Sequence, residues 1–338
     1  MEEIIHPLKI GSLVLKSNII QAPLASYSSR SYRHLCAMYG SPVGISEMVS
    51  AEGLLREGEK TLKLIKPADT EKTSDCCKSD RTDDVKIPYA VQLFGSIPES
   101  FKKAVNVLLK HINTPLIDIN AACPVQKVIR NGCGGALMEK PLLIKEIVKC
   151  VKSESGANVS VKIRLGKDEY NINYLECAEA AFEGGADMIS IHARTVKDLY
   201  GGSADYNHPK NLKAHFKEKI ILTSGDIFSY QKAKEVIEFT LTDGVLAARG
   251  AIGNPFIFSD DGNVNDKDYI SALKTHIALH VMYNDTPLKD LRKFIPYYFK
   301  HLKNSKNVKD AKTTICCSAS SYNDFINAIN RIILPETP

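Results

Sequence analysis

The loop that follows an expected strand over residues 115–120 combines a thiol with two cations. Cys123 stands directly before Pro124, where the chain must turn. Lys127, Arg130 and a cluster of glycines come next, and an amphipathic helical pattern follows them. In proteins built from alternating strands and helices, catalytic groups lie at the carboxyl ends of strands. The segment therefore favours a reactive site, although a single cysteine is more often a small buried hydrophobe.

Polar residues also stand at the ends of five other expected strands. Each of them alone is compatible with a buried hydrogen-bonding or ion-pairing role, but together they predict a polar, cation-rich mouth. These residues are Gln92, Lys162, Arg164, His192, Arg194, Ser224, Gly225, Asp226, Ala248 and Arg249.

The last two strand ends are the most specific. In strand–helix barrels the loops after strands seven and eight commonly bind phosphate through backbone N–H groups and a short helix. Residues 224–226 and 248–251 are small enough for close backbone approach, and Arg249 adds a charged donor. We therefore expect a phosphorylated cofactor here.

Strand-like and helix-like segments alternate as far as residue 258. Eight such units predict a (β/α)8 TIM barrel. A doubly wound sheet is the alternative, but the first strand–helix turn lacks a Gly-x-Gly-x-x-Gly motif. The expected strands cover residues 18–22, 43–49, 89–94, 115–120, 159–164, 188–192, 220–224 and 244–248, and the expected helices 31–39, 98–111, 142–151, 173–183, 211–216 and 230–239.

Two regions depart from this alternation. Residues 66–84 are polar without apolar periodicity, and we expect a solvated loop. After a polar linker, only helical patterns remain, over 269–283, 287–302, 308–317 and 322–333. We therefore divide the chain into a catalytic barrel, residues 1–258, and an all-helical domain, residues 265–338. Basic and aromatic residues interleave in the helical domain, so RNA binding stands beside a simple solvated helix face as its interpretation.

The composition of the 338-residue chain is that of a globular protein, with 44% hydrophobic and 25% charged residues. No apolar run reaches 18 residues and no secretory signal opens the chain, so we expect a cytoplasmic protein without a membrane span. The nine cysteines form no Cys-x-x-Cys pair, so we expect no metal site. The net charge of +5 permits an acidic partner such as RNA. We expect a monomer.

Several ordered motifs resemble the tRNA-dihydrouridine synthases, most closely their bacterial B-type branch. They run through nearly the whole expected barrel. The motifs are Pro7-Leu-Lys-Ile-Gly, Ala22-Pro, Ser46-Glu-Met-Val-Ser-Ala, Val91-Gln-Leu-Phe-Gly, Asn120-x-x-Cys-Pro-x-x-Lys-Val, Val161-Lys-Ile-Arg-Leu-Gly, His192-Ala-Arg-Thr, Gly225-Asp-Ile and Ala248-Arg-Gly-Ala-x-Gly-Asn-Pro.

The resemblance implies FMN-dependent reduction of uridine to 5,6-dihydrouridine in tRNA, with NADPH as reductant. It makes Cys123 the general acid that protonates C5 of uracil. The implied cofactor-binding residues are Pro23, Leu24, Gln92, Lys162, His192, Ser224, Gly225, Asp226, Ala248 and Arg249. The residues that we assign to the RNA substrate are Asn120, Lys127, Arg130 and Arg194. We expect the glycines of 132–135 to form a mobile loop that closes over a flipped base.

Ala122, Ser224 and Ala248 replace residues that are usual in the family, and the loop at 24–29 lacks the family's usual Thr-Asp. Two other functions stay open at this point. One is an FMN-dependent barrel that acts on a small molecule, as dihydroorotate dehydrogenases do. The other is a catalytically silent RNA-binding protein that retains the barrel.

Overall fold

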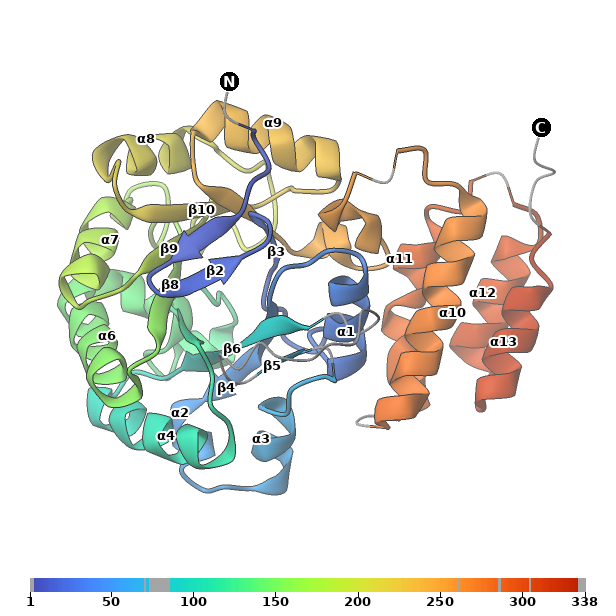
Figure 1. Ribbon diagram of the computed structural model, residues 1–338, viewed down its shortest axis with the longest axis horizontal. Helices are drawn as coiled ribbons and strands as arrows, with labels where there is room; N and C mark the ends of the chain where they lie inside the picture. The colour runs from blue at the N-terminus through green and yellow to red at the C-terminus, as the bar shows by residue number, and fades with distance from the viewer. Residues whose placement is uncertain are drawn as a thin grey trace.

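A computed structural model describes residues 3–69, 71–72, 86–260, 262–284, 287–303 and 305–333. Eight parallel strands form a nearly closed barrel, which occupies one end of the molecule (Figure 1). They follow one another around it in the order β3-β11-β10-β9-β8-β7-β6-β4, which confirms the predicted TIM barrel and excludes the doubly wound sheet. The strands are β3 (Ile19–Gln21), β4 (Gly44–Ser50), β6 (Ile87–Phe94), β7 (Leu116–Asn120), β8 (Asn158–Ile163), β9 (Met188–His192), β10 (Ile220–Ser224) and β11 (Gly244–Ala247).

Helices cover the outside of the barrel, and the six that the apolar periodicity predicts are all present. The helix expected over 211–216 begins earlier, at Asn207, and the helix expected over 142–151 ends later, at Ser155. Short helices over 51–54, 59–64 and 126–129 were not predicted. The barrel helices are α1 (Arg30–Met38), α2 (Ala51–Leu54), α3 (Glu59–Leu64), α4 (Pro98–His111), α5 (Gln126–Ile129), α6 (Pro141–Ser155), α7 (Tyr174–Glu183), α8 (Asn207–His215) and α9 (Tyr230–Thr240).

The barrel is closed between β3 and β4 by side chains. Gln21, at the end of β3, is fully buried and accepts a hydrogen bond from the backbone N–H of Ile45 at 3.2 Å. Its own backbone N–H donates to the hydroxyl of Ser41, which in turn donates to the carbonyl of Val43. The amide of Gln21 also donates to Ser28 at 3.1 Å in the loop that follows β3. One glutamine thus replaces part of a strand–strand ladder.

A hairpin that the sequence analysis missed covers the amino-terminal end of the barrel. It consists of β1 (Leu8–Ile10) and β2 (Leu13–Leu15), joined by Gly11 with a positive φ of 55°. Its buried leucine and isoleucine side chains pack with the lowest interior residues of the barrel strands. Strands of three residues are too short for a period-two pattern to indicate them. The hairpin leaves the opposite, carboxyl end as the open face.

The expectation of a solvated loop over residues 66–84 is wrong at Glu71. This residue lies in β5 (Glu71–Lys72), which pairs with β6, and its carboxylate is buried against Arg33 at 2.7 Å. The same carboxylate accepts the backbone N–H of Ala68. A charged residue can be buried only when it is paired and hydrogen-bonded in this way, which sequence patterning does not reveal. Residues 70 and 73–84 of the expected loop lie outside the described part of the chain.

The carboxyl-terminal region is helical, as predicted, and it packs on α1 (Figure 1). The helix expected over 287–302 is instead a 3₁₀ helix followed by a short α-helix that has Pro296 in its first turn. Within the described ranges, no helix is long and apolar enough to cross a membrane. The elements are α10 (Asp266–Tyr283), η4 (Leu288–Lys293), α11 (Ile295–Phe299), α12 (Val308–Cys317) and α13 (Tyr322–Asn330).

The helical region and the barrel share one apolar core. The ring of Tyr32 in α1 lies 5.7 Å from that of Phe294 and 6.2 Å from that of His276. In the loop after β3, Tyr27 makes an edge-to-face contact with Phe294 at 5.2 Å. The sequence pattern changes between residues 258 and 265, but the apolar core continues from the barrel into the helical region.

Replacing Gln21 by alanine should weaken the closure of the barrel. The backbone N–H of Ile45 loses its acceptor inside the core, and an unsatisfied buried group together with the lost amide costs about 2–3 kcal/mol of unfolding free energy. Gln231→Ala, at an exposed position of α9, is the matched control and should change stability by less than about 0.5 kcal/mol. Urea unfolding followed by circular dichroism measures both, and equal losses in the two variants would contradict the role of Gln21.

Candidate active site

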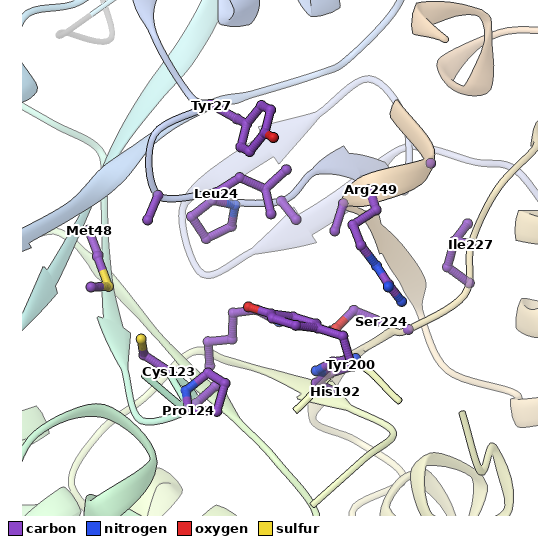
Figure 2. Close-up of a pocket in the computed structure, with 18 of the residues that line it drawn as sticks. Leu24, Tyr27, Met48, Cys123, Pro124, His192, Tyr200, Ser224, Ile227 and Arg249 are labelled. Carbon is purple, nitrogen blue, oxygen red and sulfur yellow. The ribbon is translucent and has the colours of Figure 1, made fainter. Parts of the chain in front are cut away.

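A cavity of about 270 Å³ opens at the carboxyl ends of the barrel strands (Figure 2). Most of the predicted site residues line it, although they come from six different strand ends and from the loop after β3. The predicted residues that line the cavity are Pro23, Leu24, Gln92, Asn120, Cys123, Lys162, His192, Ser224, Gly225, Asp226, Ala248 and Arg249.

A chain of hydrogen bonds forms the floor of the cavity, and it begins at the buried carboxylate of Asp118. Asp118 accepts hydrogen bonds from Gln92 at 2.6 Å and from Ser160. The carbonyl oxygen of Gln92 then accepts the amide of Asn120 at 2.9 Å. The side-chain oxygen of Asn120 accepts a hydrogen bond from the backbone N–H of Cys123 at 2.8 Å. Because an ionised carboxylate only accepts and a backbone N–H only donates, the two ends fix the orientation of both amides.

Lys162 is the nearest cation to this floor. Its ammonium group donates to the hydroxyl of Ser224 at 3.0 Å. Burial lowers the pKa of Lys162 to about 8, an effect that the charge of Asp118 opposes. Burial also raises the pKa of Asp118 to about 6. The two groups thus form a buried pair in which the charge of each favours the charged form of the other and opposes the effect of burial.

His192 lies among cations and stays neutral. Burial, and then the charges of the neighbouring lysine and arginines, lower the pKa of His192 far below its usual range. Its ring packs against Gly225, where an added Cβ would lie 3.0 Å from the imidazole. The φ of Gly225 is +116°, which also favours glycine. A neutral imidazole can both donate and accept a hydrogen bond at the cavity wall.

Asp226 organises the arginines on the far side of the cavity. It accepts hydrogen bonds from Arg194 at 2.6 Å, from the backbone N–H of Ala204 at 2.9 Å and from Arg249 at 3.2 Å. Arg194 is 3% exposed and lies behind the cavity wall, where it also donates to the carbonyls of Gly201 and Gly202. Its Nε and Nη2 are committed to the protein, whereas its Nη1 is buried without a hydrogen-bond partner among the described residues, so its contact with substrate stays a prediction.

The two remaining predicted substrate residues lie outside the cavity. Lys127 is in the short helix α5 and Arg130 caps it, and both side chains are exposed beside the mouth. The expected mobile glycine loop is not observed at Gly134 and Gly135, which are buried in the 3₁₀ helix η1 (Gly134–Glu139). The N–H of Gly135 donates to the carbonyl of Cys123 at 2.9 Å, so these glycines support the cysteine from below.

Several residues of the cavity were not predicted. Tyr200 extends across the middle of it in Figure 2, and Tyr27 lies on the opposite side. Tyr297 comes from α11, so the helical region contributes to the cavity wall. Met48 also lines the cavity, as does Arg164, which the sequence analysis placed at the polar mouth without assigning it to a ligand. Arg164 is visible in the sequence as a charge at the end of a strand, whereas no local pattern distinguishes the tyrosines from other aromatic residues.

The cavity fits a planar, phosphorylated cofactor. Gln92, Lys162 and the neutral His192 offer donors and acceptors to the edge of a ring system. Beside them, the 3₁₀ helix η2 (Arg249–Ala251) begins directly after β11. An added Cβ at Gly250 would lie 1.9 Å from the carbonyl of Ile227, so the loops after β10 and β11 approach closely there. Small residues and one arginine at this place suit a phosphate group.

Comparison with known proteins gives concordant results. The profile of the dihydrouridine synthase (Dus) family matches residues 20–331. A probable tRNA-dihydrouridine synthase of Treponema pallidum is 32% identical, with 96% of this chain and 95% of that protein covered. The tRNA-dihydrouridine synthase B of Pasteurella multocida is 31% identical, with 91% of each covered. The old yellow enzyme of Trypanosoma cruzi shares the fold at a TM-score of 0.53 and 14% identity, over 84% of this chain and 98% of that one.

Replacing Asp118 by asparagine should make Lys162 less basic. The ionised carboxylate now opposes the effect of burial on Lys162, so its loss lowers the pKa of the ammonium group further below about 8. Competitive acetylation of Lys162, read by mass spectrometry, should be about threefold to tenfold faster at pH 7. Asp310→Asn, at an exposed position of α12, should leave this rate unchanged. An unchanged rate in Asp118→Asn would show that the carboxylate does not act on Lys162.

Proposed function

Because the chain belongs to the dihydrouridine synthase family, we propose that it reduces uridine to 5,6-dihydrouridine in tRNA, using FMN and NADPH. The observation that supports this most directly is the position of Cys123. Its half-buried thiol lines the same cavity as Lys162 and Gln92, and its backbone is held from beneath by Asn120. A proton donor beside a site for a planar cofactor is what reduction of a carbon–carbon double bond requires.

FMN, when bound, would supply hydride for C6 of uracil, with NADPH as the source of its reducing equivalents. Gln92 and Lys162 would hold the ring edge, and Lys162 would stabilise negative charge there. His192 would donate or accept in the same region as a neutral ring. Pro23 and Leu24 would cover the ring from the loop after β3. Residues 224–226, Ala248 and Arg249 would hold the phosphate.

Cys123 would act as the general acid. Burial raises the pKa of its thiol, whereas a hydrogen bond from the Val125 backbone and the charge of Arg164 lower it. The thiol is therefore protonated at neutral pH, and the hydrogen bond from Val125 and the charge of Arg164 stabilise the thiolate that forms when it loses its proton. When hydride reaches C6, negative charge develops at C5, the S–H bond of Cys123 breaks and a C–H bond forms.

The substrate would reach this cavity as a single flipped nucleotide, because a stacked base cannot enter it. Tyr27, Tyr200 and Tyr297 at the mouth offer faces on which bases stack. Lys127 and Arg130 lie exposed beside the mouth and would contact phosphates. The helical region adds exposed basic residues, which are Lys289, Lys303, Lys306, Lys309 and Lys312. A cytoplasmic location agrees with this substrate, and a monomeric state stays a prediction.

Cys123→Ala should abolish most product formation without loss of the cofactor. The thiol is the proposed proton donor and is not part of the proposed phosphate site. Flavin absorbance of the purified protein should therefore persist. Formation of dihydrouridine in unmodified tRNA, with NADPH and read by mass spectrometry, should fall about 10²- to 10⁴-fold.

The exposed Cys317→Ala is the matched control and should keep the activity of the original protein. Undiminished product in Cys123→Ala would remove the cysteine from the acid role. A protein that binds no flavin would instead indicate a silent RNA-binding barrel. Oxidation of dihydroorotate or reduction of orotate, with no product in tRNA, would indicate a small-molecule oxidoreductase.

A further inference from the structure

Arg164, directly after β8, connects the two loops on either side of the strand. Its side chain is among the largest that are fully buried, with 1% of the residue exposed. The Nε donates to the carbonyl of Ala122 at 2.8 Å, in the loop after β7. One terminal nitrogen donates to the carbonyls of Thr195 and Leu199, at 2.6 and 2.8 Å, in the loop after β9. The planar guanidinium thus holds three carbonyls in fixed relation.

The loop after β9 depends on this contact for its shape. Leu199 has a φ of +53°, which a leucine rarely adopts without support. Asp198 accepts the backbone N–H and the hydroxyl of Thr195, which closes the turn from within. The ring of Tyr200 then lies over the guanidinium of Arg164, 5.5 Å from its centre. Arg164 therefore holds the turn that brings Tyr200 across the cavity.

The segment that carries Cys123 is held from three sides. Asn120 accepts the N–H of Cys123, and the carbonyl of Cys123 accepts the N–H of Gly135. Arg164 adds the third contact through the preceding carbonyl, that of Ala122. The first two are contacts between neutral groups. Arg164 alone brings a full positive charge to the segment.

Cys123 is one of several charged and titratable groups around Arg164. The others are Tyr200, Arg194, Asp198, Lys162 and His192. Burial lowers the pKa of Arg164 to about 10, so the guanidinium remains charged at neutral pH. Asp198 is committed to Thr195, and Arg194 is paired with Asp226.

We propose that Arg164 is the positioning residue for Cys123: it fixes the segment that carries the thiol and stabilises the thiolate left when the proton passes to C5 of uracil. This role rests on the proposed function. The proton that Cys123 gives up enters the new C–H bond, and the thiolate takes a proton from water before the next turnover. Arg164 itself neither gains nor loses a proton.

Two variants separate charge from geometry in the full-length protein as purified. Arg164→Gln removes the charge, whereas Arg164→Lys keeps it but loses the fork that reaches three carbonyls. Arg56→Gln, at an exposed arginine after α2, is the control. The readouts are the rate of Cys123 alkylation by iodoacetamide as a function of pH, measured by mass spectrometry, and amide hydrogen exchange of residues 121–123 and 195–201.

In Arg164→Gln the midpoint of the alkylation profile should rise, and the rate at pH 8 should fall about tenfold. In Arg164→Lys the rate should stay within about threefold of the original, because a positive charge remains. Both variants should exchange faster at 121–123 and 195–201, and Arg56→Gln should change neither readout. An alkylation profile of Arg164→Gln that superimposes on the original overturns the proposal.

If Arg164→Gln does not fold, Arg164→Lys decides alone. Unchanged exchange at 121–123 in that variant overturns the proposal, and faster exchange there with a retained alkylation midpoint supports it. Alkylation requires neither RNA nor NADPH. A failure of the proposed reduction of uridine would therefore leave this readout intact, and the two failures are distinguishable.

Discussion

The buried carboxylate of Asp118 is the constraint on which the arrangement of the cavity depends. A carboxylate inside a barrel is costly unless hydrogen bonds and a nearby cation compensate it. Parallel register supplies these partners, because Gln92 and Ser160 lie directly opposite Asp118 on the two neighbouring strands. Once Asp118 accepts from both, Gln92 has one possible orientation. Gln92 in turn fixes the amide of Asn120, which accepts the backbone N–H of Cys123. The position of Cys123 at the mouth therefore depends on the buried charge of Asp118.

The interior of the barrel is divided into an apolar half and a polar half. Ile20, Leu116, Met188, Leu222 and Leu246 form the lower layer, on which the β1–β2 hairpin packs. The polar layers begin about two residues further along each strand, where period-two alternation returns the side chains to the interior. Packing at the lower end thus supplies stability that the polar end does not. This division follows the general rule that barrel function lies at the carboxyl ends of the strands.

The sequence predicted the barrel and most of the cavity for the same reason. Apolar strands ending in a polar residue are a local pattern, and Gln92, Lys162, His192 and Ser224 all follow it. What it did not predict depends on partners distant in the chain. Glu71 is buried because Arg33 meets it, and Arg194 is withdrawn from the cavity because Asp226 accepts its guanidinium. Charge in a sequence shows that a partner is needed, but it does not show whether that partner is protein or ligand.

The tyrosines of the mouth extend this reasoning to the helical region. Tyr297 lines the cavity from α11, and its ring makes an edge-to-face contact with Tyr27 at 6.1 Å. Tyr27 also contacts Phe294, which is buried in the core that α1 shares with the helices. A displacement of α11 would therefore disturb the loop that carries Pro23 and Leu24 as well as the cavity wall. The helical region with its exposed basic residues is thus attached to the mouth through close-packed aromatic rings, and this packing fixes its position relative to Cys123.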